Sequence, residues 1–363
     1  MSIGIALLGA GVFAKKEPEP TEHLPAINSS ELFTLKAVYS RSQSSAENFV
    51  STAFEGEACK DIDAYFDSPS VQSKSLDDLL RRSDIAAVII AVAIDVAPVL
   101  IKKALAAGKH VLSEKPIAPD LNIARSLVDY SQGIKGALWG VGENFRFWDS
   151  VHRAAKIIKD LDANLLTFSV AAFSFTDSRN PFYHSEWRQK PTFQGGYLLD
   201  GGVHFVAVLR TLLGALGRKI ESTSAYTMSL QQNLPPVDTI HAILRTDNGR
   251  SGSYISSVGT EAKLGMEFEI VTDKGVITYR PFEMKILTKL KNQLDKWENQ
   301  TEPAPLMWGV KEEVAAFAES IATGRLDSRL STSEALEDLR VMEAMLMSAE
   351  NGGRPVTIAR DTA

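Results

Sequence analysis

Several features that mark particular classes of protein are missing from this sequence. Cys59 is the single cysteine among 363 residues, so no disulfide can form within the chain, and a cytoplasmic location is expected. The longest apolar run, residues 85–94, is too short to cross a bilayer. The net charge is −6, with acidic and basic residues mixed along the chain, so neither nucleic acid nor a membrane is an expected partner.

The first third of the chain alternates short apolar runs with helical patterns. Four runs have the continuous apolar character of buried strands in a parallel sheet. They cover residues 3–8, 32–40, 84–93 and 109–114. Residues 96–108, between two of these runs, show a helical pattern that ends at a glycine. The alternation predicts a doubly wound α/β domain over residues 1–134.

Residues 135–363 have a different pattern and are expected to form a second domain, because 363 residues are many for one core. Residues 164–175 are rich in β-branched and aromatic residues, and hairpin patterns follow at 241–258 and 267–280. Successive hairpins predict a largely antiparallel sheet. The polar segment 290–305 is expected to be a loop or an insertion, and two amphipathic helices are expected after it.

The sequence GAGVFA, directly after the first predicted strand, is a glycine turn. Gly9 suits a tight turn, Gly11 lets a pyrophosphate approach the backbone, and Ala14 allows close packing. The phosphates would bind free backbone N–H groups in this turn, at Val12 and Phe13 among others. The turn predicts dinucleotide binding, with a purely structural turn as the alternative.

The end of the second predicted strand indicates which dinucleotide binds. An acidic side chain there would hydrogen-bond the ribose 2′-hydroxyl of NAD, whereas this strand ends with Ser40 and Arg41. An arginine pairs with a 2′-phosphate, and a serine donates a hydrogen bond to it. NADP(H) is therefore expected rather than NAD(H). The alternative for Arg41 is a solvated surface charge.

Asp200 and His204 lie four residues apart in the stretch LLDGGVHF, with two glycines between them. On a helix this spacing places both side chains on one face. The pair suits proton transfer, two metal ligands, or a helix cap beside a core histidine. The other histidines form no second cluster at ligand spacing, so no metal site is expected.

The motifs Glu114-Lys115-Pro116, Trp187-Arg188, Gly195-Gly196 and Asp200 with His204 follow one another along the chain. With the glycine turn, they resemble the Gfo/Idh/MocA family of NAD(P)-dependent oxidoreductases. HLP at 23–25 and WRQKP at 187–191 resemble a fungal NADP(H)-dependent branch of it. The resemblance implies a Rossmann domain followed by an α/β domain with a large, mostly antiparallel open sheet.

The resemblance implies that Lys115, Asp200 and His204 converge beside the nicotinamide, contact the substrate and form the catalytic set. Hydride transfer at a carbinol carbon needs a proton moved on its oxygen, and histidine titrates near the working pH. His204 is the expected general acid and base, and Asp200 is expected to orient or stabilise its ring. Lys115 would polarise the carbonyl or donate the proton itself.

The resemblance also implies further contacts to the cofactor. These come from Ala93, Ile94, Glu114, Lys115, Asn144, Trp187 and Arg188. The alternative for Arg188 is a buried structural arginine. Tyr183 and His184 are expected to border the substrate pocket, with a surface loop as the alternative. Pro116 is expected to follow a cis peptide. The family often has an acid three residues after the histidine, and Ala207 replaces it here.

These motifs predict an NADP(H)-dependent oxidoreductase that transfers hydride between nicotinamide C4 and a carbon of a sugar, a polyol or a related carbonyl compound. The alternatives are a non-catalytic NADP-binding sensor of the same fold and a reductase of an imine or a secondary-metabolite ketone. An open sheet needs a cover, so a homodimer, or else a tetramer, through the second domain is expected.

Overall fold

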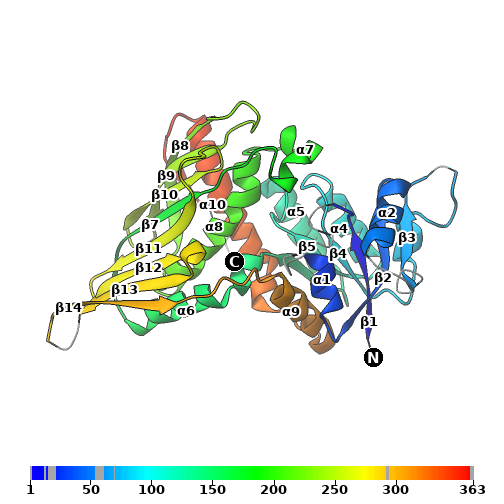
Figure 1. Ribbon diagram of the computed structural model, residues 1–363, viewed down its shortest axis with the longest axis horizontal. Coiled ribbons are helices and arrows are strands. Elements are labelled where there is room, and N and C mark those ends of the chain that lie inside the picture. The colour runs from blue at the N-terminus through cyan, green and yellow to red at the C-terminus, as the bar shows by residue number, and fades with distance from the viewer. Residues whose placement is uncertain are drawn as a thin grey trace. The chain divides into compact units, whose positions relative to one another are not determined.

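The structure is a computed structural model that describes residues 2–11, 14, 22–53, 61–68, 70–291 and 294–359. The chain forms two compact units, and Figure 1 labels most of their helices and strands. Unit 1 comprises Met1–Phe147 and Trp308–Leu336, and unit 2 comprises Trp148–Met307 and Glu337–Ala363.

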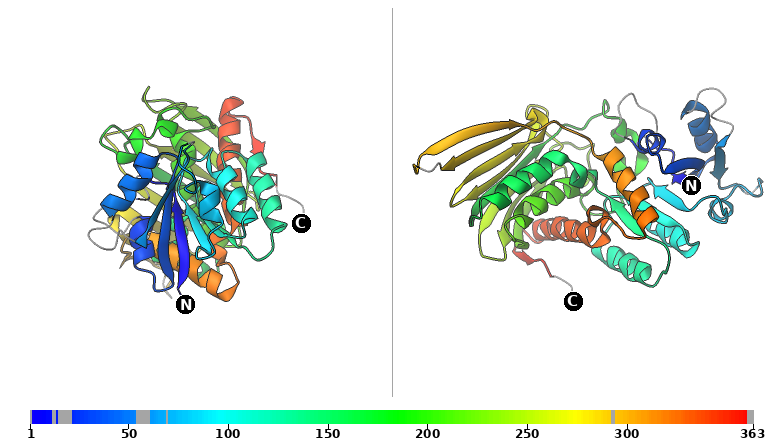
Figure 2. Two further views of the ribbon diagram at one scale, coloured as in Figure 1. Left: turned by 90° about the vertical axis from the view of Figure 1, so that its right-hand side faces the viewer. Right: turned by 90° about the horizontal axis from the view of Figure 1, so that it is seen from below.

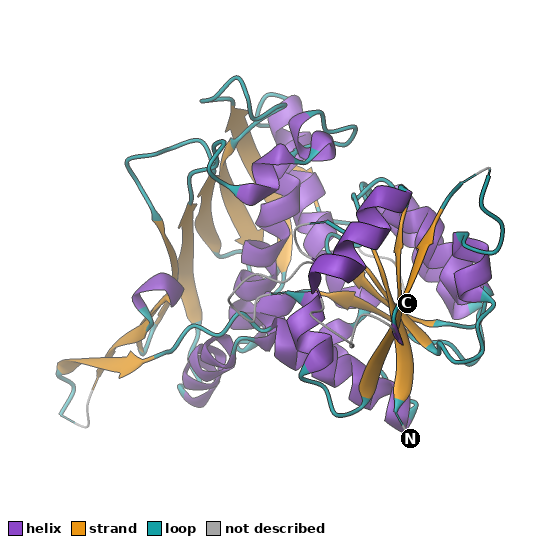
Figure 3. Cartoon of the chain, turned by 45° about the vertical axis from the view of Figure 1, so that its right-hand side comes forward, coloured by secondary structure: helices purple, strands orange, loops and turns teal. Residues whose placement is uncertain are grey.

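Unit 1 is built on a six-stranded parallel sheet with the strand order β3-β2-β1-β4-β5-β6 and helices on both faces (Figure 3). The strands are β1 (Ile3–Leu8), β2 (Phe33–Ser40), β3 (Asp63–Phe66), β4 (Ala87–Ile90), β5 (His110–Glu114) and β6 (Trp139–Gly142). The helices are α1 (His23–Asn28), α2 (Gln43–Ala53), α3 (Leu76–Leu80), α4 (Ala97–Ala106), α5 (Leu121–Gln132) and α9 (Val310–Thr323), with 3-10 turns η3 (Asn144–Phe147) and η6 (Ser328–Leu330). This confirms the doubly wound α/β fold.

The central strand β4 shows why the strands of this sheet appear in the sequence as continuous apolar runs. All four of its residues are buried, between β1 on one side and β5 on the other. The apolar run 84–93 is longer than the strand because β1 ends at Leu8, which pairs with Ile90. Beyond that point the N–H of Ala91 donates to the carbonyl oxygen of Leu8 at 2.9 Å, and the chain then turns toward α4.

Helix α9 belongs to unit 1, although it lies far along the chain. It runs beside α1 (Figure 1), and its apolar face, with Val314 and Phe317, is part of the same core as Ile5 and Leu7 of β1. The sequence predicted two continuous domains, with the boundary between residues 134 and 135. The contacts instead group Trp308–Leu336 with the first unit, because α9 buries its apolar stripe there.

Unit 2 is built on a nine-stranded sheet with the order β14-β13-β12-β11-β7-β10-β9-β8-β15. The strands are β7 (Leu165–Phe173), β8 (Ile220–Met228), β9 (Thr239–Thr246), β10 (Ser251–Ser257), β11 (Gly265–Thr272), β12 (Gly275–Arg280), β13 (Lys285–Lys291), β14 (Trp297–Pro303) and β15 (Val356–Thr357). The helices are α6 (Asp149–Asp160), α7 (Glu186–Gln189), α8 (Tyr197–Gly214) and α10 (Thr332–Glu350, which begins in unit 1), with η4 (Pro181–His184) and η5 (Pro281–Glu283). Neighbouring strands are antiparallel except β7 and β10, which confirms the mostly antiparallel sheet.

The expectation of a loop at residues 290–305 was wrong. Residues Trp297–Pro303 form the edge strand β14, which pairs with β13 in a hairpin. Six of the seven residues of β14 are exposed. The strand therefore lacks the alternation of apolar and polar residues by which a half-buried strand is recognised.

Helices α6, α8 and α10 lie against one face of the sheet of unit 2 (Figure 2). Among the described residues, α8 is the one helix that is long and apolar enough to span a membrane by length and composition alone. Of its residues, 67% are buried inside the protein, as a core helix requires.

Candidate active site

The predicted cofactor segments of unit 1 lie at the carboxyl ends of its strands. Because all six strands are parallel, these ends meet at one edge of the sheet, where open α/β sheets bind nucleotides. Gly9 and Gly11 follow β1, Ser40 and Arg41 close β2, Ala93 and Ile94 follow β4, Glu114 ends β5, and Asn144 follows β6. The fold thus brings these segments to one edge.

The glycine turn after β1 has the geometry that its sequence predicts. Gly9 has a φ of +124°, and a Cβ there would lie 2.1 Å from the carbonyl oxygen of Ala91, so a side chain is excluded. A Cβ at Gly11 would meet no described atom within 4 Å, which leaves room for a phosphate beside the backbone. Val12 and Phe13 lie outside the described residues.

The end of β2 carries no acid. Arg41 is exposed and Ser40 is half-buried. The neighbouring Tyr39 donates its hydroxyl hydrogen to Oδ2 of Asp67 at 2.6 Å. Burial, and then this hydrogen bond, raise the pKa of Tyr39. The Asp67 carboxylate, which follows β3, thus accepts a hydrogen bond within the protein.

Glu114 and Lys115 form the turn at the end of β5. The peptide between Lys115 and Pro116 is cis, as expected. The Oε1 atom of Glu114 lies 2.6 Å from Nε2 of His23, which is 1% exposed and begins α1. Sequence reasoning gave His23 no role, and no local pattern could pair it with a residue 91 positions away. Lys115 is half-exposed.

Asn144 begins the turn η3 after β6, and its side chain is held within unit 1. Its Nδ2 donates to the carbonyl oxygen of Trp308 at 2.7 Å. Gly309, at φ +80°, lies so close that a Cβ would be 2.3 Å from the Asn144 carbonyl oxygen. The side-chain amide of Asn144 therefore has a partner within the protein, and its contact with the cofactor stays a prediction.

Two glycines set the start of helix α8 in unit 2. Gly195 and Gly196 have φ angles of +82° and +49°, which favour glycine. A Cβ on Gly195 would lie 2.6 Å from Leu346, and one on Gly196 would lie 2.4 Å from the carbonyl oxygen of Pro235. This close approach fixes the first turn of the helix, where Asp200 lies with 8% of its surface exposed.

Arg188 holds the carboxylate of Asp200. Its Nε donates to Oδ2 of Asp200 at 2.8 Å, and its Nη1 donates to Oγ of Ser185 at 3.1 Å. The guanidinium also lies over the ring of Trp187, 3.9 Å from the ring centroid. The spacing in the sequence did not predict this pair. Arg188 gives Asp200 a permanently charged partner.

His204 lies one turn after Asp200 in α8 and is half-exposed. The glycines between the two residues have different surroundings. A Cβ on Gly202 would lie 2.7 Å from Cε of Met342, whereas one on Gly201 would meet nothing described within 4 Å. Gly202 therefore allows α8 to pack on α10, and Gly201 leaves open space near His204.

Tyr183 and His184 lie in η4, ahead of this helix. Tyr183 packs against a small buried cluster that includes Tyr197, and its hydroxyl accepts a hydrogen bond from Asn233 at 3.3 Å. Nε2 of His184 lies 2.8 Å from the carbonyl oxygen of Ser178. Burial raises the pKa of Tyr197 to about 12, so its hydroxyl keeps its proton at neutral pH. The substrate contacts of Tyr183 and His184 stay predictions.

The site residues divide between the units. Unit 1 holds the glycine turn, Ser40, Arg41, Glu114, Lys115 and Asn144, and unit 2 holds Tyr183, His184, Trp187, Arg188, Asp200 and His204. Across the described ranges, no group of three His, Cys, Asp or Glu side chains has the arrangement of a metal site. The donors present suit proton transfer and hydrogen bonding.

Comparison with known proteins agrees with both units. Residues 3–139 match the oxidoreductase family's NAD-binding Rossmann fold, and residues 164–358 match its C-terminal alpha/beta domain. The chain belongs to the Gfo/Idh/MocA family of oxidoreductases. This confirms the resemblance seen in the motifs.

Relatives within this family match almost the whole chain. Dehydrogenase FPY6 of Fusarium mangiferae is 42% identical over 354 residues, which is 97% of both chains. A solved oxidoreductase from Thermotoga maritima is 29% identical, covers 99% of both chains and has a TM-score of 0.83. The structure of a levoglucosan dehydrogenase with NADH and L-sorbose is 18% identical, covers 99% of this chain and 100% of its own, and has a TM-score of 0.79, which shows the shared fold.

Proposed function

We propose that this Gfo/Idh/MocA oxidoreductase uses NADP(H) and transfers hydride between nicotinamide C4 and the carbonyl or carbinol carbon of a sugar, a polyol or a related small compound. One observation carries the proposal most directly. The glycine turn, Arg41, Glu114 and Lys115 all lie at the carboxyl edge of one parallel sheet. A dinucleotide laid along that edge would reach a lysine suited to polarise a carbonyl.

Arg41 and Ser40 support NADP(H) over NAD(H). They stand at the strand end where the adenosine ribose binds in this fold, and β2 ends there without a carboxylate to repel a 2′-phosphate. The family itself does not decide this choice, because the levoglucosan dehydrogenase was solved with NADH. The proposal therefore depends on the residues of this chain.

The chemistry of the site follows from its side chains. The bound nicotinamide supplies or accepts the hydride. Lys115 donates a hydrogen bond to the substrate oxygen, and His204 gives or takes the proton there. Asp200, held by Arg188, lies one helical turn before His204 and would orient its ring. The sugar bound to the levoglucosan dehydrogenase supports a polyhydroxylated substrate.

The test is a fluorescence titration of the protein with NADPH and NADH, followed by a screen of sugars, polyols and aldehydes at the nicotinamide absorbance. Tighter binding of NADPH with turnover on a carbonyl compound is the expected result. R41D should weaken NADPH binding about tenfold or more and leave NADH binding nearly unchanged. Tight binding without turnover on any compound would favour a nucleotide sensor.

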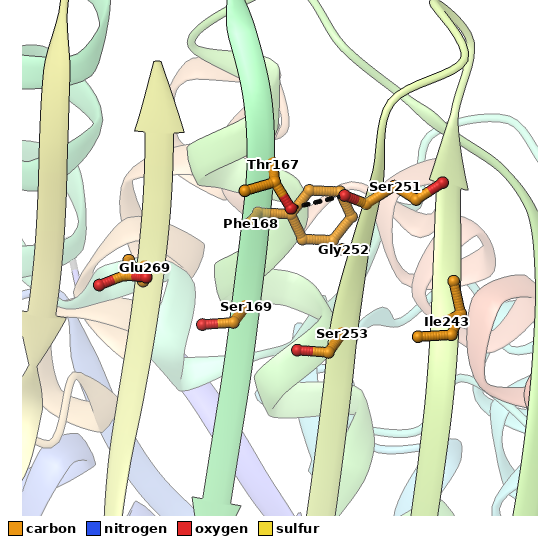
Figure 4. A pocket seen from close by; sticks show the side chains of 8 residues that line it. All are labelled: Thr167, Phe168, Ser169, Ile243, Ser251, Gly252, Ser253 and Glu269. Atoms are coloured by element: carbon orange, nitrogen blue, oxygen red, sulfur yellow. Dashed lines mark hydrogen bonds between the residues drawn. The ribbon is translucent and has the colours of Figure 1, made fainter. Parts of the chain in front are cut away.

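We also propose a homodimer through the uncovered face of the sheet of unit 2, with a tetramer as the alternative. Figure 4 shows a shallow pocket on this sheet, lined by Thr167, Phe168, Ser169, Ile243, Ser251, Gly252, Ser253 and Glu269. Three strands of this sheet carry exposed large side chains, which are Leu166, Tyr226 and Ile243. Light scattering should give twice the mass of the 39.6 kDa chain, and I243E should lower it.

A further inference from the structure

Helix α9 places a glutamate in the interior of unit 1. Glu313 lies in the first turn of α9 and is 1% exposed. The same helix buries Val314 and Phe317 in the core of the unit. A carboxylate at full burial is rare unless a cation or several donors hold it. The Oε2 atom of Glu313 has no hydrogen-bond partner in the part of the chain that the structure describes.

The carboxyl group of Glu313 lies beside Gly142 at the end of β6, next to the strand that ends at Glu114. A Cβ on Gly142 would be 2.7 Å from Oε1 of Glu313 and 3.3 Å from Oε2. Gly142 ends β6 and is the register partner of Glu114 at the end of β5. The carboxyl group of Glu313 is therefore one strand away from the Glu114–Lys115 turn. A side chain at position 142 would force the carboxyl group of Glu313 to move.

The charges around Glu313 come from four elements. Burial raises the pKa of Glu313 well above its ordinary value, and the carboxylates of Glu114 and Glu143 raise it further. Arg146 of η3 and Lys115 act in the opposite direction. From α1, His23 faces the same cluster through its contact with Glu114. The two cations oppose the effect of burial and do not overcome it.

When Glu313 is uncharged, the cluster holds equal numbers of positive and negative charges. Glu114 and Glu143 then supply two negative charges, and Lys115 and Arg146 supply two positive charges. An ionised Glu313 would add a third anion, and the remaining basic group of the cluster, His23, already contacts Glu114. Such a carboxylate takes up a proton rather than carry the cost of desolvation.

We propose that Glu313 is an uncharged carboxylic acid that acts as a positioning residue for Lys115. It fills the space beside Gly142, one strand from the Glu114–Lys115 turn, and leaves the charges of Glu114, Glu143, Lys115 and Arg146 in balance. The inference rests on the proposed function only for the role of Lys115. The neutral state of Glu313 can be tested without any substrate.

The first test is infrared spectroscopy, in which a protonated carboxylic acid has a C=O stretch separate from that of a carboxylate. Wild-type protein at pH 7 should show this band, and E313Q should lose it. In E143Q the band should persist at low pH and disappear at a lower pH than in wild type, because one anion that raises the Glu313 pKa is gone. Identical spectra of wild type and E313Q at pH 7 would overturn the inference.

The second test compares the same substitution at two glutamates that are each 1% exposed, Glu313 and Glu143. E313Q replaces one neutral group by another, so its pH profile of kcat should overlay that of wild type. E143Q removes a negative charge, so its profile should move to lower pH. A displaced profile in E313Q would show that Glu313 is ionised in the working enzyme, and unmoved profiles in both variants would show that the cluster does not control Lys115.

The variant E313A tests whether Glu313 positions the turn that carries Lys115. We expect kcat to fall about tenfold or more because the turn loses its support, with the Kd of NADPH nearly unchanged, and E313Q should rescue most of the loss. Full activity in E313A, or equal losses in E313A and E313Q, would contradict a positioning role for a neutral acid. A protein that shows the infrared band and never turns over would refute the proposed function and leave the neutral acid in place.

Discussion

Glu114 of unit 1 and Asp200 of unit 2 each lie beside a basic side chain, but the partners differ in kind. Asp200 is held by Arg188, whose charge is permanent and whose guanidinium rests on Trp187. Glu114 contacts His23, a residue type that gains and loses a proton near neutral pH. The comparison teaches that one acid of the predicted site is paired with a permanent cation, whereas the other contacts a side chain whose charge is not permanent.

The two units also position their residues by different means. In unit 1 the functional segments follow parallel strands, so the topology of the sheet brings them to one edge. In unit 2 a single helix, α8, presents Asp200 and His204 at a spacing of one turn. Changes in unit 2 should therefore act on one helix face, and changes in unit 1 should act through the ends of separate strands.

The largest effects are expected from the predicted proton-transfer groups, one in each unit. K115A and H204A should each lower kcat by about 10² to 10⁴-fold, because each removes a group that acts on the substrate oxygen. Both should bind NADPH nearly as wild type does. Steady-state kinetics with a fluorescence titration of NADPH checks both points. Activity near the wild-type level in either variant would place the proton transfer elsewhere.

Breaking the ion pair between Arg188 and Asp200 should have the next largest effect. R188A leaves the carboxylate of Asp200 buried without its cation, so kcat/KM should fall about 100-fold. R188K keeps the charge and loses the planar contact with Trp187, so it should recover only part of the loss. R179A is the matched control, because Arg179 is 72% exposed and pairs with Asp177 on the surface. An equal loss in R179A would mean that the effect is not specific to Asp200.

Breaking the histidine pair should cost less. H23F keeps a buried ring and removes the contact to Glu114, so kcat/KM should fall about tenfold. H152F changes an exposed histidine and serves as its control. If H23F loses as much activity as R188A, the two acids depend equally on their partners and the contrast between them fails.

The smallest effect on activity is expected from E313Q, whose consequence is instead a change in the pH dependence of stability. Folded Glu313 keeps its proton while the unfolded residue loses it above its ordinary pKa of 4.5, so ionisation favours the unfolded chain as pH rises. The wild type should therefore lose up to about 1.4 kcal/mol per pH unit relative to E313Q between pH 4.5 and the raised pKa. Urea denaturation of both proteins from pH 4.5 to 8 measures the difference. A constant difference across that range would contradict a protonated Glu313.

The sequence alone predicted the parts of the fold that carry strong local patterns. The glycine turn at Gly9 and the buried runs at β1, β2, β4 and β5 predicted the Rossmann sheet, and the hairpin patterns predicted β9, β10, β11 and β12 of unit 2. The sequence did not predict the four-residue strands β3 and β6 or the exposed edge strand β14. Short or exposed strands lack an apolar period.

The candidate site shows the same division. Asp200 and His204 could be named because a helical spacing links them, and Lys115 because a short motif carries it. Their supporting partners could not be named. His23 pairs across 91 positions, and Glu313 reaches the Glu114 turn only because α9 returns to the first unit. Such contacts depend on tertiary packing, which leaves no local pattern in one sequence.

The most direct measurement follows an isotope. The enzyme would be given NADPH carrying deuterium at C4 together with a mixture of aldoses, ketoses and simple aldehydes, and the products would be analysed by mass spectrometry. Our account predicts deuterium on a carbinol carbon of a sugar-type product, with far less product from H204A and K115A. Tight binding of NADPH with no deuterated product from wild-type enzyme would contradict it.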